Sequence, residues 1–144
     1  MKAGSGELCD KVINMENHDN KKKAEEKENI AVIRLRGNVT IKKDFEKTMQ
    51  MLKLHKRNFC VIIPKIPAYL GMVEKVKDHV TWGEIDEQTS KELKEKRSDG
   101  DKKFYRLNSP KGGLGRRGVK ASFKKSGALG YRGKKINDLL KRMM

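Results

Sequence analysis

The fold is decided by the stretch from Ile30 to Ile85, which reads IAVIRLRGNVTIKKDFEKTMQMLKLHKRNFCVIIPKIPAYLGMVEKVKDHVTWGEI. Three short apolar runs in it, residues 30–36, 59–63 and 81–85, have the length and composition of β-strands. Apolar residues recur at helical spacing in both intervals between these runs, which predicts two helices. The order strand–helix–strand–helix–strand predicts an α+β core in which both helices cover one face of a small sheet.

Beyond this stretch, the sequence predicts two more helices and one more strand. A charged helix is expected from Asp86, which suits the N-cap position, to Arg97. Residues 104–107, FYRL, have the composition of a short strand. The terminal helix has one apolar face that should dock on the core, and this face consists of Ile136, Leu139, Leu140 and Met143.

The first strand carries charge as well as apolar residues. Ile33 and Leu35 alternate with Arg34 and Arg36. Because successive side chains of a strand point to opposite faces, this alternation predicts a half-buried strand with a basic outer face. The two arginines are therefore either phosphate-binding residues or solvated residues of an exposed strand face.

Positive charge is concentrated in the last third of the chain. The 144 residues include 35 Lys or Arg and 19 Asp or Glu, which gives a formal net charge of +16. Residues 1–28 mix both signs and have few apolar side chains, so we expect a flexible charged tail before a core domain at residues 29–101. Residues 102–144 hold 14 Lys or Arg and a single acid, Asp138, which predicts a basic arm that binds a polyanion, most simply nucleic acid.

The arm contains a glycine-rich segment, residues 109–133, which reads SPKGGLGRRGVKASFKKSGALGYRG. Glycine allows the backbone to approach a partner closely, and Lys and Arg neutralise phosphates. Gly115 is followed by two arginines rather than by the lysine and the Ser or Thr of a P-loop, so we expect no mononucleotide site. The glycine-rich segment fits the backbone of a polynucleotide better than it fits a mononucleotide.

Three aromatic residues, Tyr105, Phe123 and Tyr131, lie among the basic residues of the arm. Such side chains either stack on exposed bases or anchor the loop on the domain. The sequence favours neither role over the other. The role of Trp82 is equally open.

Several classes of function find no support in the sequence. Cys9 and Cys60 form no CxxC motif and the three histidines do not cluster with either thiol, so we expect two reduced thiols, with neither a disulfide framework nor a metal site. No nucleophile stands beside a base, so we do not expect an enzyme. No apolar run approaches the ~18–20 residues of a membrane span. We therefore expect no cofactor, no small-molecule substrate and no membrane partner.

Five ordered blocks resemble the archaeal type of the L-thirty family of large-subunit ribosomal proteins, the universal uL-thirty family, whose eukaryotic relative is called L-seven. These blocks are IAVIRLRG, MLKLHKRNFCVII, PAYLGMVEKVKDHVTWGEID, FYRLNSPKGG and GALGYRGKKINDLLKRM, and they run from Ile30 to Met143. The resemblance implies a small split β-α-β core of the ferredoxin-like type. It also implies a non-enzymatic, structural role in cytoplasmic ribosomes, bound to the large rRNA, close to the 5S rRNA and beside other large-subunit proteins.

The family blocks and the basic arm together give the candidate rRNA-binding residues. By position, the resemblance implies rRNA contacts at the first strand, the helix-to-strand connection, the PKGG turn and the ALGYRG block. The candidates are Arg34, Arg36, His55, Lys56, Arg57, Lys111, Gly112, Gly113, Arg116, Arg117, Lys120, Lys124, Lys125, Tyr131, Arg132, Lys134 and Lys135.

The chain departs from the archaeal pattern in two places. Archaeal relatives usually carry a helical segment of several tens of residues where this chain has only SDGDKK, from Ser98 to Lys103. The leader at residues 1–28 is also unusual for the archaeal type. The alternative function is a free-standing RNA- or DNA-binding regulator with the same small domain.

Overall fold

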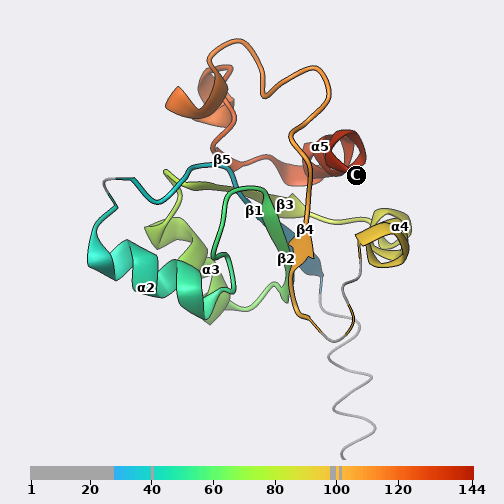
Figure 1. Cartoon of the computed structure of the whole chain (residues 1–144), viewed down its shortest axis with the longest axis horizontal. Helices are drawn as coiled ribbons and strands as arrows, with labels where there is room; N and C mark the ends of the chain where they lie inside the picture. The colour runs from blue at the N-terminus through green and yellow to red at the C-terminus, as the bar shows by residue number, and fades with distance from the viewer. Residues whose placement is uncertain (1–27, 40, 98–99, 101) are drawn as a thin grey trace, which may run out of the picture.

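The computed structural model describes residues 28–39, 41–97, 100 and 102–144. A five-stranded sheet forms the centre of the molecule, with helices on both of its faces (Figure 1). The strands are β1 (Asn29–Arg34), β2 (Phe59–Pro64), β3 (Val80–Glu84), β4 (Tyr105–Arg106) and β5 (Gly130–Tyr131). The helices are α2 (Lys43–Met51), α3 (Pro67–Lys75), α4 (Glu87–Arg97) and α5 (Ile136–Met143). The predicted tail, apart from Glu28, lies outside the described residues.

The sheet contains the predicted split β-α-β unit. Its strand order is β4-β2-β1-β3-β5, and β1 is antiparallel to both β2 and β3. The strands β2 and β3 therefore run in the same direction, with β1 inserted between them and α3 connecting them. In the register of the sheet, Val32 of β1 faces Val61 on one side and Trp82 on the other. The α+β prediction is confirmed.

One face of the sheet is covered by α2 and α3, as the sequence predicts. Ile30 and Val32 of β1 lie on this face and pack into one apolar cluster with Met49 of α2 and Val73 of α3. All four side chains are almost completely buried. Pro67 occupies the start of α3, where its missing N–H removes no helical hydrogen bond.

The other face of the sheet is covered as well, so the prediction of a basic outer face on β1 is wrong. Ala31 and Ile33 lie in a second apolar cluster with Leu93 of α4 and with α5. The apolar face of α5 docks there as predicted, and each of its four residues is 0% exposed. Figure 1 shows α4 and α5 on the side of the sheet away from α2 and α3.

Arg34, predicted to face solvent, is only 2% exposed. Its guanidinium lies among backbone carbonyls at the end of the sheet. Nε donates to the Arg36 carbonyl at 2.9 Å, and Nη1 donates to the carbonyls of Leu54 at 2.8 Å and His55 at 3.0 Å. Nη2 donates to Asn38 Oδ1. Burial lowers the pKa of Arg34 from its usual value. The side chain thus ties the connection before β2 to the end of β1.

Cys60 of β2 is a free thiol that is completely buried. Burial raises its pKa to about 12, so the reactive thiolate is scarcely present at neutral pH. Cys9 lies outside the described residues. In the described part of the chain, no group of three or more His, Cys, Asp or Glu could hold a metal ion. None of the described helices is long and apolar enough to span a bilayer.

The second face is closely packed at Gly83 of β3. A Cβ at this position would collide with the Gly133 carbonyl oxygen and lie 3.0 Å from Ile136 Cβ. Only glycine lets the turn before α5 approach β3 this closely, so Gly83 fixes where α5 begins.

We expect Gly83→Ala to destabilise the protein by about 1–3 kcal/mol, since the backbone of the turn must move away. The matched control is Gly71→Ala in α3, where a Cβ would meet no heavy atom within 4 Å. Alanine there should stabilise the helix by about 0.5–1 kcal/mol. Denaturant unfolding monitored by circular dichroism measures both effects, and equal stabilities would contradict the packing at Gly83.

We expect Arg34→Lys to lower the free energy of unfolding by about 2 kcal/mol or more, because lysine keeps the charge but not the fork of donors. Arg36→Lys, at a less buried position of the same segment, should change it by less than about 0.5 kcal/mol. The same unfolding measurement compares the two variants. If Arg34→Lys were as stable as the control, the carbonyl contacts would not contribute to stability.

Candidate nucleic-acid interface

The basic residues converge because of the strand directions. The end of β1 lies beside the beginnings of β2 and β3, since β1 is antiparallel to both strands. Because β4 is antiparallel to β2, the chain leaves β4 at this same end of the sheet. Because β5 is parallel to β3, the chain enters β5 there. We call this region the basic end, and it comprises residues 35–38, 55–58, 77–79 and 107–129.

The connection between α2 and β2 presents three predicted residues at the basic end. His55, Lys56 and Arg57 are all exposed. The His55 ring stands edge-on to Phe104, with ring centroids 6.4 Å apart. The Asn58 N–H donates to the Arg34 carbonyl at 2.7 Å, which closes the connection onto β1. These three side chains are therefore presented by a fixed backbone.

Arg36 lies next to this connection and is partly exposed. Its Nη1 donates to the Asp78 carbonyl at 3.2 Å, so its side chain reaches toward the segment before β3. Of the two predicted arginines of the first strand, Arg36 alone remains available to an external partner.

The segment between β4 and β5, which we call the glycine-rich loop (residues 109–129), extends beyond the sheet and is drawn in orange in Figure 1. It contains no acidic residue. Backbone hydrogen bonds fold it on itself, including Phe123 N–H to the Leu129 carbonyl at 2.7 Å and Ala128 N–H to the Gly118 carbonyl at 3.0 Å. Its predicted cations are all exposed, and they are Lys111, Arg116, Arg117, Lys120, Lys124 and Lys125.

The PKGG turn opens this loop and is held from α5. Gly112 and Gly113 both have φ near +78°, a conformation that favours glycine. The Gly113 N–H donates to the Pro110 carbonyl at 3.1 Å. Arg142 of α5 donates to the Gly113 carbonyl at 3.1 Å and to the Lys111 carbonyl at 3.4 Å. The exposed side chain of Lys111 therefore projects from a turn that the terminal helix positions.

Arg132, a predicted contact residue, is instead a packing residue with 9% exposure. Its Nε donates to Thr81 Oγ1 at 3.1 Å, and its Nη2 donates to the Ala128 carbonyl at 3.2 Å. The guanidinium also lies 4.7 Å from the centroid of the Phe123 ring. Burial lowers its pKa, and the nearby charge of Arg142 lowers it further. Arg132 thus anchors Phe123, and with it the glycine-rich loop, on β3.

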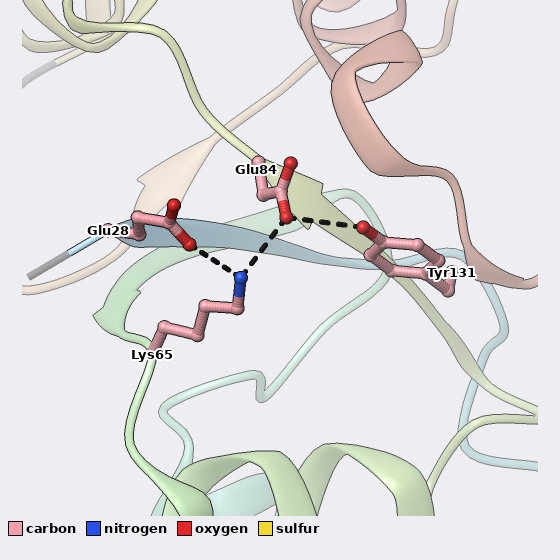
Figure 2. Close-up of polar contacts among 4 residues, drawn as sticks. All are labelled: Glu28, Lys65, Glu84 and Tyr131. Carbon is pink, nitrogen blue, oxygen red and sulfur yellow. Dashed lines mark hydrogen bonds and ion pairs between the residues drawn. The ribbon is translucent and has the colours of Figure 1, made fainter.

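Lys134, Lys135 and Tyr131 follow the loop and are exposed. The Tyr131 hydroxyl donates to Glu84 Oε1 at 3.2 Å, and Lys65 bridges Glu84 and Glu28 at 3.2 and 2.5 Å (Figure 2). Burial, followed by the charge of Glu84, raises the pKa of Tyr131, so its hydroxyl stays protonated. This network lies away from the basic end and holds the exposed Tyr131 ring in a defined orientation.

Some residues of this surface were missed by the sequence analysis. Lys77 follows α3 and is exposed, and it lines a groove that Trp82 and the glycine-rich loop also line. Arg106 of β4 is exposed, with its guanidinium 5.9 Å from the centroid of the Phe59 ring. Lys77 precedes one predicted strand and Arg106 lies within another, but only the register of the sheet places Lys77 at the basic end and Arg106 next to it.

Comparison with known proteins agrees with these features. The profile of the family described as "Ribosomal protein L30p/L7e" matches residues 30–80. Three similar proteins, each named large ribosomal subunit protein uL30, come from archaea. The relative from Nanoarchaeum equitans is 38% identical, over 78% of this chain and 96% of its own length. The relatives from Methanopyrus kandleri and Methanococcus maripaludis are 39% and 41% identical and align over 100% and 98% of their lengths.

The alignments also contain a length difference. The alignment with the Nanoarchaeum equitans relative spans 149 positions but covers only 78% of the 144 residues here. That relative therefore contains several tens of residues without a counterpart in this chain, and the short connection after α4 is where we expect the difference. Identity above a third over nearly the whole length of these relatives establishes the relationship: the chain belongs to the ribosomal protein L30p/L7e family.

Proposed function

We propose that this protein is a structural constituent of the large ribosomal subunit and binds rRNA through its basic end. The observation that carries the proposal is the convergence of exposed cations from separate connections at one end of the sheet. The glycine-rich loop supplies most of them and contains no acid. The relatives that cover this chain are named as large-subunit proteins.

Phosphate contacts dominate binding in this proposal. Exposed Lys and Arg on a fixed loop release counterions from RNA when they neutralise its phosphates. At the basic end, the candidates are the predicted residues that are exposed or partly exposed, namely Arg36, His55, Lys56, Arg57, Lys111, Gly112, Gly113, Arg116, Arg117, Lys120, Lys124 and Lys125. Tyr131, Lys134 and Lys135, which follow the glycine-rich loop and are also exposed, complete the set. Arg34 and Arg132 act indirectly, because their guanidinium groups hold the backbone that presents these residues.

The protein acts without catalysis, in the cytoplasm, as part of the ribosome. Within the subunit, residues 29–101 supply most of the core and residues 102–144 form the arm that reaches the rRNA, although β4, β5 and α5 of this arm also pack into the core. A position close to the 5S rRNA and beside other large-subunit proteins follows from the family resemblance, and it is part of the proposal.

The direct test is sedimentation of a cell lysate through a sucrose gradient, followed by washing of the large-subunit fractions in rising salt. We expect the protein in stoichiometric amounts in large subunits after a moderate salt wash. Immunoblotting of each fraction measures its distribution. Recovery mainly at the top of the gradient would contradict a structural role and favour a free-standing regulator.

We expect the double substitution Lys120→Gln and Lys124→Gln to weaken binding to purified large-subunit rRNA and to reduce its salt dependence. The slope of log K against log salt should become shallower by about 0.7–0.9 for each phosphate contact that is lost. The control is Lys91→Gln with Lys94→Gln, two exposed residues of α4 outside the basic end. Filter binding at several salt concentrations measures both slopes, and equal slopes would argue against phosphate contacts in the loop.

A further inference from the structure

A groove with a volume of about 550 Å³ lies between the β3–β5 edge of the sheet and the glycine-rich loop. This volume is within the range of about 300–1,000 Å³ that is usual for small-molecule sites. We propose that the groove holds one unpaired base of the bound RNA, with the adjoining phosphates on the cations of its rim. The inference rests on the proposed function and adds a base-recognition site to it.

Aromatic side chains form the part of the groove that would contact the base. The Tyr131 ring is 49% exposed, although most other large apolar side chains of the described region are buried. Its hydroxyl is held by Glu84, so the ring is already oriented before a base arrives (Figure 2). Trp82 lies beside it, with ring centroids 6.4 Å apart. Stacking on such a ring stabilises a base of any sequence.

Phe123 is the third aromatic residue of the groove, and its role differs. The Arg132 guanidinium lies 4.7 Å from its ring centroid, and Lys135 Nζ lies 5.8 Å from it. These contacts fix the Phe123 ring in the wall of the groove and hold the glycine-rich loop next to β3. The structure thus leaves Tyr131 as the stacking surface and makes Phe123 an anchor.

The rim carries the charge that the flanking phosphates require. Arg36 and Lys77 line one side, Lys120 and Lys124 line the glycine-rich loop side, and Asp78 is the only acid among the described lining residues. Positive side chains on both sides of an aromatic surface match a nucleotide chain that enters and leaves the groove. An apolar protein segment would leave these cations without partners, so we favour RNA.

Trp82 makes the groove directly observable, since it is the only tryptophan in the chain. The experiment titrates the full-length protein with a single-stranded oligoadenylate ten nucleotides long. We expect quenching of the Trp82 fluorescence as a base stacks on the neighbouring Tyr131 ring. An oligomer of the same length made of abasic sites has the same charge, and it should bind by anisotropy without quenching.

Substitutions at Tyr131 measure how much base stacking contributes to RNA binding, because they leave the charge of the groove unchanged. Tyr131→Ala should weaken oligoadenylate binding about 5- to 150-fold, the range expected for loss of one base–aromatic stack. Tyr131→Phe keeps the ring and should bind within about threefold of the unsubstituted protein. The matched control is Tyr69→Ala, which removes another exposed tyrosine, from α3. Circular dichroism checks that each variant is folded.

Three outcomes would overturn the groove as a base site: no quenching by oligoadenylate, quenching by the abasic oligomer, or equal affinities of Tyr131→Ala and Tyr69→Ala. Equal quenching by a polyglutamate peptide would also overturn it, in favour of an acidic protein segment. Sedimentation with large subunits tests the proposed function separately. If Tyr131→Ala and the unsubstituted protein both remain in washed subunits while Trp82 is not quenched, the inference fails and the proposed function stands.

Discussion

The enclosure of β1 is the constraint on which the rest of the structure depends. This strand is paired along both edges, and its residues from Ile30 to Ile33 are at most 1% exposed. A strand with two apolar faces is stable only if a layer covers each of them. The layer of α2 and α3 comes from the chain between the strands, whereas the second layer requires α5 to return from the C-terminus. The glycine-rich loop is therefore tethered to the core at both ends.

The pattern and composition of the sequence were sufficient to predict β1 to β4, but they predicted neither β5 nor the environment of each residue. The order of strands and helices along the core and the apolar face of α5 follow from spacing, whereas the split β-α-β arrangement of the strands was implied by the family resemblance. For Arg34, alternation assigns any charged residue to the solvent, yet a guanidinium is stable when buried if enough acceptors surround it. Two of its acceptors are the carbonyls of Leu54 and His55, about 20 residues away. Only the folded chain brings them together.

The candidate interface was predictable as a region and not as a set of side chains. The concentration of charge in the last third of the sequence identified the glycine-rich loop. It did not distinguish the exposed Lys124 from the buried Arg132, since both lie in the same basic, glycine-rich segment. The groove was beyond sequence reasoning for another reason. Lys77, Trp82 and Tyr131 meet there only through the parallel pairing of β3 with β5.

The basic end also links folding to binding. Exposed cations in one loop without an acid repel one another, so they reduce the stability of the isolated protein. The loop keeps its shape because uncharged contacts hold it, including its backbone hydrogen bonds and the packing of Phe123 under Arg132. A polyanion that binds the folded form more tightly than the unfolded chain removes the repulsion and stabilises the fold by mass action. The same residues that weaken the free protein thus make its stability depend on the RNA to which we propose it binds.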